Sequence, residues 1–262
     1  MRILVTNDDG INAPGLVLAE EIAAEIAGPD GEVWVVAPDN ERSGVGHCIS
    51  YVAPTRLTRL GERRFSLDGY PADCVLVGLH KVLTGKTVDL VLSGVNRGHN
   101  VAEDVVYSGT AGAAMEAGLN RVRAVALSQY YRSTDGAPED MWASTRAFGI
   151  QAVQAALEMP CPDTVFYNIN FPAESPANVH GMKVCPHGIR EEATFEISDY
   201  TSPSGREFQF VRHRTANQSA PAGSDARLLI EGWVTISPLR PQLTATDLLD
   251  QAAEVLSARA AE

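Results

Sequence analysis

The sequence has few cysteines and no long apolar run, and each shortage excludes a class of protein. The four cysteines, Cys48, Cys74, Cys161 and Cys185, are widely spaced and form no Cys-x-x-Cys pair. This spacing argues against a disulfide framework or a zinc ribbon. No apolar stretch reaches the roughly 18 residues that a membrane span requires. Met1 leads directly into a strand-like segment without the pattern of an export signal. We therefore expect free thiols and a cytoplasmic location.

Basic residues are also scarce, with 21 Lys and Arg against 33 Asp and Glu and a net charge of -12. This balance disfavours nonspecific binding to nucleic-acid polymers or anionic membranes, since both reward clustered basic side chains. A small anionic substrate needs local hydrogen-bond donors or a cation to overcome the repulsion. The charge therefore favours a site with a bound divalent metal.

The chain is long enough, at 262 residues with 45% hydrophobic content, to bury a large core. Its first part alternates short apolar runs with helical periodicities, which is typical of a mostly parallel sheet covered by helices. The expected strands are residues 3–5, 33–37, 90–92, 125–127 and 165–171. The expected helices are residues 14–26, 73–83, 109–119 and 143–157. The pattern predicts the α/β class.

A different pattern follows in the last third of the chain. Residues 183–236 contain period-two segments, such as 195–197 and 208–211, separated by a turn at 202–205, and we expect a β-rich arm. A final amphipathic helix follows, with Thr244 and Asp247 as its expected capping box. We treat residues 1–262 as one domain, in which about 1–180 form the α/β core and about 181–262 form the arm, a late strand and the C-terminal helix.

Ligands of open α/β sheets bind at the carboxyl ends of the strands, so polar residues that follow strands are the first candidates. Asn7-Asp8-Asp9-Gly10 follows the first strand. Two carboxylates about 4 Å apart repel by roughly 4 kcal/mol at an effective dielectric near 20, and a divalent cation removes that cost. Oxygen ligands favour Mg²⁺ or Mn²⁺ over zinc. The alternative is that Asn7 and Asp8 cap the next helix while Asp9 is a solvated turn residue.

Two further polar loops follow expected strands. In residues 37–44, Ser43 offers the metal a neutral oxygen and Arg42 can meet a phosphate. In residues 93–100, Asn96 can ligate a cation through its amide oxygen without adding charge, and the neighbouring glycines permit close backbone approach. Taken singly, each is also compatible with an ordinary loop.

A fourth cluster, residues 107–117, consists of small residues that open a helix. Helix N-termini present unpaired N–H groups and a partial positive charge, so Ser108, Gly109 and Thr110 are candidate phosphate ligands. We add Asn12, from the first cluster, as a further candidate. The alternative is a helix packed tightly on the sheet through Gly and Ala. It is not a Walker loop, because no Gly-Lys-Ser/Thr follows.

Together, the four clusters resemble the SurE family of survival-protein nucleotidases in their order along the chain. The likeness extends through residues 68–75, 168–172 and 232–239. It implies a Rossmann-like core and a cytoplasmic 5′-nucleotidase that hydrolyses nucleoside 5′-monophosphates, with one divalent metal, Mg²⁺ or Mn²⁺, held by Asp8, Asp9, Ser43 and Asn96. It also implies a homodimer or homotetramer whose subunits exchange the β-hairpin arm, near 190–215, and the C-terminal helix. Residues 45–50 and 239–243 depart from the family pattern.

Several points stay open at this stage. The catalytic candidates are Asp8, Asp9 and Asn96, and a covalent route through Asp8 is disfavoured by the adjacent aspartates. His47 and His99 are candidate proton donors to the leaving alkoxide, or else surface or supporting histidines, and the other four histidines receive no role. The alternative function is a noncatalytic nucleotide-binding or stress-signalling module. A dinucleotide-dependent oxidoreductase is excluded, because two aspartates replace the glycine-rich fingerprint.

Overall fold

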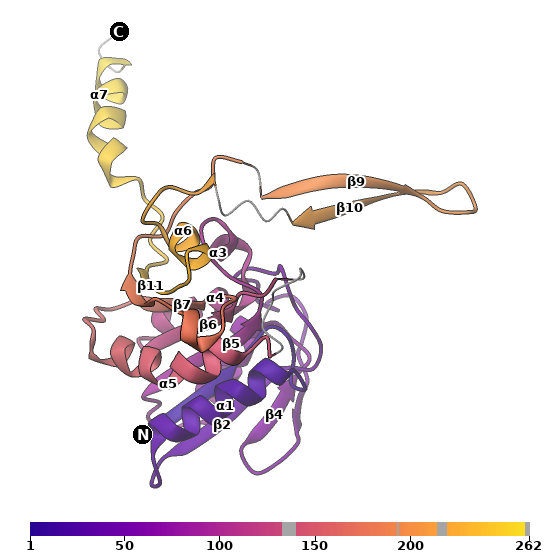
Figure 1. The fold of residues 1–262 in the computed structure, drawn as a ribbon, viewed down its shortest axis with the longest axis vertical. Helices are drawn as coiled ribbons and strands as arrows, with labels where there is room; N and C mark the ends of the chain where they lie inside the picture. Colours follow the sequence, from indigo (N-terminus) through magenta and orange to yellow (C-terminus); the bar gives the residue numbers. More distant parts are fainter. Residues whose placement is uncertain (133–139, 193, 214–218, 260–262) are drawn as a thin grey trace.

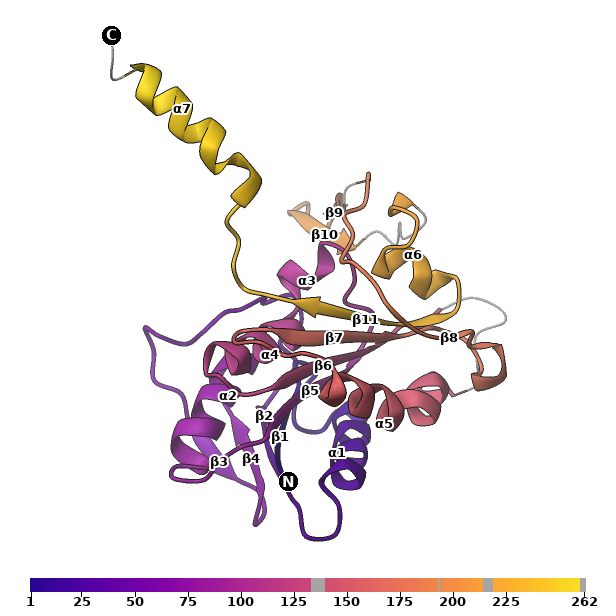
Figure 2. The same cartoon turned by 90° about the vertical axis from the view of Figure 1, so that its left-hand side faces the viewer.

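The structure is a computed structural model that describes residues 1–132, 140–192, 194–213 and 219–259. Helices cover both faces of a large, mostly parallel sheet, and a separate hairpin and a terminal helix project from this body (Figures 1 and 2). The strands are β1 (Arg2–Thr6), β2 (Glu32–Pro38), β3 (Leu57–Arg59), β4 (Arg64–Leu67), β5 (Leu90–Arg97), β6 (Ala124–Gln129), β7 (Phe166–Phe171), β8 (Gly181–Val184), β9 (Phe195–Thr201), β10 (Glu207–His213) and β11 (Trp233–Leu239). The helices are α1 (Pro14–Ala27), α2 (Pro71–Val77), α3 (Asp104–Tyr107), α4 (Gly109–Leu119), α5 (Ala143–Glu158), α6 (Asp225–Ile230) and α7 (Leu249–Arg259), with shorter turns η1 (Gly78–Val82), η2 (Pro176–Asn178) and η4 (Thr246–Leu248).

The order of strands across the sheet determines where a ligand can bind. The order is β3-β4-β2-β1-β5-β6-β7-β11-β8, and β1 pairs in parallel with both β2 and β5. The chain therefore builds outward from β1 on one side through β2, β3 and β4, and then returns to the other side of β1 as β5. Such a reversal opens a crevice at the carboxyl ends of the two strands. The crevice lies between the ends of β1 and β5.

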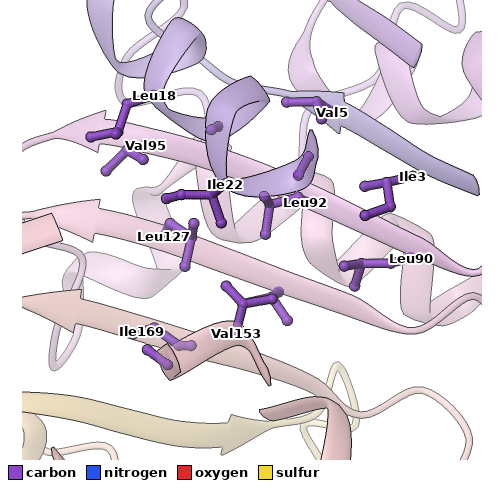
Figure 3. Packing of buried hydrophobic residues seen from close by; sticks show 14 of the residues in the cluster. Ile3, Val5, Leu18, Ile22, Leu90, Leu92, Val95, Leu127, Val153 and Ile169 are labelled. Carbon is purple, nitrogen blue, oxygen red and sulfur yellow. The ribbon is translucent and has the colours of Figure 1, made fainter. Parts of the chain in front are cut away.

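The central strands are mostly apolar on both sides, because both faces of the sheet are buried. Ile3 and Val5 point to the face covered by α1 and α5, whereas Leu4 points to the face covered by α2 and α4. On the first face, Ile22 of α1 and Val153 of α5 pack against side chains of the central strands (Figure 3). Burying one such side chain contributes about 1.5–3 kcal/mol relative to exposing it. This packing holds the strand ends, and hence the crevice, in fixed positions.

The β9–β10 hairpin forms a two-stranded sheet of its own, with Phe195 opposite His213 at its root (Figure 1). Helix α7 extends away from the sheet and has no buried residue (Figure 2). Both segments were expected, and the described part of the arm is confirmed as a hairpin turning at residues 202–205. Among the described residues, no helix is long and apolar enough to cross a bilayer.

The structure differs from the sequence expectations in three places. The stretch 183–236, expected to be β-rich, also contains α6, a six-residue helix buried through Leu228 and Leu229. The edge strand β3 and its neighbour β4 were missed, since they are short and partly exposed. The capping box of Thr244 and Asp247 is wrong: a 3₁₀ turn at Thr246–Leu248, with no side-chain cap, precedes α7.

Candidate metal and phosphate site

The two aspartates and Asn96 meet at the crevice because their strands are neighbours. Asp8 and Asp9 follow β1, and Asn96 lies near the end of β5. The pairing of β5 with β6 shifts register between Ser93 and Asn96, and such an irregularity changes the direction of the side chains that follow. A glycine is required within this shift, because Gly94 has φ +133° and a Cβ there would lie 2.3 Å from the Leu127 carbonyl oxygen.

Asp8 is held in one orientation by the first turn of α4. The Thr110 hydroxyl donates to Asp8 Oδ1 at 2.6 Å, and the Thr110 backbone N–H donates to Asp8 Oδ2 at 3.1 Å. Close contact with this turn depends on Gly109, where a Cβ would lie 2.9 Å from Asp8 Cβ. The Asp8 side chain is thus fixed at the positive end of a helix dipole. The residue is only 3% exposed.

The two carboxyl groups carry perturbed pKa values. Burial raises the pKa of Asp8 to about 7, the Thr110 hydroxyl lowers it, and the Asp9 carboxylate raises it further. Burial also raises the pKa of Asp9, which the Arg97 N–H, 3.0 Å from Oδ2, lowers and the Glu41 carboxylate raises. Two adjacent carboxylates that resist ionisation are the electrostatic condition that a bound cation relieves.

The remaining predicted ligands, Asn96 and Ser43, line the same cavity as Asp8. Asn96 Nδ2 donates to the Gly98 carbonyl at 2.9 Å, which leaves its amide oxygen as the ligand atom. Ser43 is exposed, and its hydroxyl donates to Glu41 Oε1 at 3.0 Å. No group of three or more His, Cys, Asp or Glu side chains suited to a metal occurs within the described ranges. The donor set that fits a cation here is two carboxylates with neutral oxygens, which suits a hard ion.

A cavity of about 480 Å³ opens beside these residues. Its lining combines the polar residues Asp8, Ser43, Asn96 and Ser108 with glycines, histidines and several aromatic rings. The full lining is Asp8, Ser43, Gly44, Asn96, Arg97, Gly98, His99, Asn100, Asp104, Tyr107, Ser108, Tyr130, Tyr131, Phe195 and His213. A cavity of this size, with a few polar groups at defined positions, is typical of a small-molecule site.

The four candidate phosphate ligands differ in their placement. Ser108 lines the cavity and caps α4, where its hydroxyl oxygen accepts the Ala111 N–H at 3.0 Å and keeps its own proton for a ligand. Gly109 begins α4, and both donors of Thr110 are directed to Asp8. Asn12 is exposed and is not among the residues that line this cavity.

Asn100 also lines the cavity and explains the Asn168-Ile169-Asn170 motif. The Asn100 N–H donates to Asn170 Oδ1 at 2.7 Å, and its carbonyl accepts from the side-chain amides of Asn168 and Asn170 at 2.7 and 3.1 Å. All three asparagines are buried. The motif on β7 therefore fixes the loop that follows Asn96.

The structure separates the two histidines proposed from the sequence. His47 Nε2 contacts Glu116 Oε2 at 2.6 Å, and His47 is not among the residues that line the cavity. His99 lines the cavity and stacks on Tyr130 with ring centroids 4.9 Å apart. Burial lowers the pKa of His99, while the Asp104 carboxylate raises it. These features favour a buried, neutral imidazole over a proton donor.

The lining residues missed in the sequence include Asp104 and His213, which belong to one ionic network. Asp104 is buried and accepts from Arg190 at 3.0 and 2.7 Å and from His213 Nε2 at 3.0 Å. Arg190 is also paired with Glu103 at 3.0 Å, and its side chain is fully buried. His213 received no role from the sequence because 109 residues separate it from Asp104. Only the fold brings them together.

The fold and the site define an open α/β protein with an oxygen-lined candidate site for a cation and a phosphate at its topological switch point. Comparison with known families agrees with this class. The sequence model described as "Survival protein SurE" matches residues 3–194. This chain belongs to the SurE family.

Relatives cover almost its whole length. The chain is 48% identical to the "5'-nucleotidase SurE" of Ruegeria pomeroyi over 254 residues, which are 95% of this chain and 98% of that protein. It is 49% identical to the protein of the same name from Cereibacter sphaeroides over 253 residues, with 95% and 97% covered. The crystal structure of the SurE protein from Aquifex aeolicus superposes with a TM-score of 0.82 at 30% identity and covers 97% of this chain and 99% of that one.

Proposed function

We propose that this protein is a metal-dependent 5′-nucleotidase that hydrolyses nucleoside 5′-monophosphates to nucleoside and phosphate. The observation that carries the proposal is the buried Asp8 carboxyl beside Asp9, fixed by Thr110 at the mouth of a nucleotide-sized cavity. Relatives named 5′-nucleotidase align over 95% of the chain, which supports the same activity here.

The residues suited to hold a cation are Asp8, Asp9, Ser43 and Asn96, and their oxygen atoms favour Mg²⁺ or Mn²⁺. When bound, such a cation supplies Lewis-acid polarisation of a phosphate oxygen and a more acidic water. Thr110 fixes the direction of the Asp8 carboxylate, and the Arg97 N–H fixes Asp9. These contacts keep the reacting centre from rearranging as charge develops.

Other residues of the chain bind the phosphate. The Ser108 hydroxyl and the first N–H groups of α4 lie beside Asp8, where a helix N-terminus favours an anion. We keep Gly109, Thr110 and Asn12 as candidates for this role, although the donors of Thr110 point to Asp8 in this structure.

We also propose that the protein acts as a homodimer or homotetramer whose subunits exchange the arm and α7. Two features support this proposal. A lone two-stranded hairpin is marginally stable in water, and α7 leaves Leu249, Val255 and Leu256 more than half exposed. Light scattering on a size-exclusion column would measure the assembly. Replacing Val255 and Leu256 together by Glu should reduce its mass, and an unchanged mass would exclude α7 from the interface.

Phosphate release from a panel of nucleoside monophosphates tests the activity. We expect release that stops with EDTA, returns with Mg²⁺ or Mn²⁺, and falls by at least about 100-fold in Asp9→Asn, since the ligands and their supporting contacts act together. Asp163→Asn, at a surface position paired with Arg121, is the matched control and should keep full activity. Release that ignores EDTA contradicts the metal mechanism. No release with any substrate or metal favours the noncatalytic nucleotide-binding module.

A further inference from the structure

Five rings form a continuous row along the cavity, which we call the aromatic belt: Tyr107, Phe195, His213, His99 and Tyr130. Successive ring centroids lie 5.0, 5.7, 5.9 and 4.9 Å apart. All five residues line the same cavity as Asp8 and Asn96. The phosphate chemistry assigned above uses none of these rings, so the belt needs another explanation.

The belt has an exposed part and a buried part. Tyr107 is 44% exposed and Phe195 is 37% exposed, although both are large aromatic residues. His99 and Tyr130, by contrast, form a stacked pair whose histidine side chain is only 8% exposed. Exposed aromatic faces gathered in a cavity mark a binding surface rather than a core. The buried pair packs behind the exposed rings, with His99 next to His213.

The exposed rings are also held in place. His213 lies opposite Phe195 in the hairpin register, so the root of the arm delivers two adjacent rings to the cavity. Asp104 accepts from His213 Nε2 at 3.0 Å and is itself held by the buried Arg190. Thr194, next to Phe195, donates to Glu103, which Arg190 also contacts. Both strands of the arm are thereby hydrogen-bonded at their root to Glu103 and Asp104, at the start of α3.

We infer that the aromatic belt is the nucleobase subsite, with Tyr107, Phe195 and His213 as the rings that contact the base. This inference rests on the proposed function, because a nucleoside 5′-monophosphate places a flat aromatic base beyond the sugar from the phosphate. Aromatic side chains stack on any nucleobase, since every base has a π-face. The belt therefore predicts a preference for nucleotides over base-free sugar phosphates and little discrimination among bases.

Adenosine binding and turnover of two substrates test the inference. Phe195→Ala should weaken adenosine binding, measured by calorimetry, by about 5- to 150-fold, the range of one base-aromatic stack. It should raise KM for adenosine 5′-monophosphate similarly, while kcat/KM for ribose 5-phosphate, which lacks the base, stays unchanged. Phe195→Tyr should restore binding. Phe208→Ala is the matched control, since Phe208 lies on the same hairpin, is 47% exposed and is not among the residues lining the cavity.

The outcomes separate this inference from the proposed function. If the wild type binds adenosine through Phe195 but hydrolyses nothing, the nucleotidase proposal fails and the subsite stands. If Phe195→Ala reduces turnover of both phosphates equally, or leaves adenosine binding unchanged, the subsite is refuted. Failure of the wild type to bind adenosine refutes it as well. Equal masses on a size-exclusion column for all variants ensure that assembly is not the cause.

Discussion

Replacing Asp8 by Asn should stabilise the metal-free protein while removing its response to metal. The pKa of Asp8 rises from 3.8 to about 7 because the carboxyl group is buried. A carboxyl whose pKa is higher in the folded state binds its proton more tightly when folded. The stability that this proton contributes is complete below pH 3.8 and is lost as the pH rises through about 7. At pH 8 the metal-free protein therefore carries the cost of a buried carboxylate.

The magnitude follows from the shift. About 3 pKa units at 1.36 kcal/mol each give roughly 4 kcal/mol at pH 8. Asn avoids this cost and still fits the site: its amide oxygen can accept the Thr110 N–H, and its NH₂ can donate to the Thr110 hydroxyl, which then acts as acceptor. We expect a gain of about 2–4 kcal/mol, or roughly 5–10 °C in the midpoint of thermal unfolding.

The assay is thermal unfolding in EDTA at pH 5 and pH 8, repeated with excess Mn²⁺. Asp8→Asn should exceed the wild type by more at pH 8 than at pH 5, and Mn²⁺ should raise the midpoint of the wild type only. Asp225→Asn is the contrasting control. Asp225 accepts three backbone N–H groups, from Ala102, Gly188 and Ala226, and an amide NH₂ cannot replace a carboxylate oxygen there. That variant should lose about 1–3 kcal/mol. A metal-free Asp8→Asn protein no more stable than the wild type at pH 8 refutes the reasoning.

Three further outcomes are expected. Thr110→Val removes the hydroxyl bonded to Asp8 and should weaken Mn²⁺ binding, measured by calorimetry, about 10- to 100-fold. Thr145→Val removes an equally buried hydroxyl and should lower stability without changing Mn²⁺ binding. Equal Mn²⁺ affinities for the two variants would contradict this. Gly109→Ala places a Cβ 2.9 Å from Asp8 Cβ and should reduce Mn²⁺ affinity at least tenfold, roughly 1.4 kcal/mol; wild-type affinity would show that the turn adapts. Burial raises the pKa of Glu103, but its hydrogen bonds lower it more, to about 2, so the stability that its carboxylate contributes is lost as the pH drops from about 4.5 toward 2. The urea midpoint should therefore fall more steeply below pH 4.5 for the wild type than for Glu103→Gln. Parallel curves would show that Glu103 does not cause this loss.

The proposed metal ligands Asp8, Asp9 and Asn96 could be selected from the sequence because their signals are local. Asp8 and Asp9 directly follow an apolar strand, and Asn96 lies in a glycine-rich segment after another, so one rule about strand ends places all three at the same edge. The alternation of helices and strands was predictable for a similar reason, since burial on both faces leaves near-continuous apolar runs. Ser43 was a candidate from its loop after a strand, but that loop was equally compatible with an ordinary loop, and the family resemblance placed Ser43 in the proposed metal set.

The aromatic belt was not predictable, because its members come from four separate segments. Tyr107 ends α3, whereas the two root residues of the hairpin, Phe195 and His213, follow 88 and 106 residues later in the chain. A sequence window detects period-two alternation in that hairpin but carries no information on what its root contacts. The Arg190 contact is equally nonlocal, since 86 residues separate it from Asp104. Helix α6 escaped detection because a six-residue helix offers less than two turns of periodicity.

The position of the belt links substrate recognition to the arm. The outer part of the hairpin leaves Ile197 and Val211 exposed, so it needs a covering surface, while its root lines the cavity. The root is fastened through Arg190, whose removal leaves Asp104 buried without its main partner, at a typical cost of 3–5 kcal/mol. These contacts hold Phe195 and His213 in place at the cavity. Because the proposed metal ligands lie on strands and loops of the sheet instead, a change at the root of the arm should alter KM for nucleotides more than it alters metal affinity.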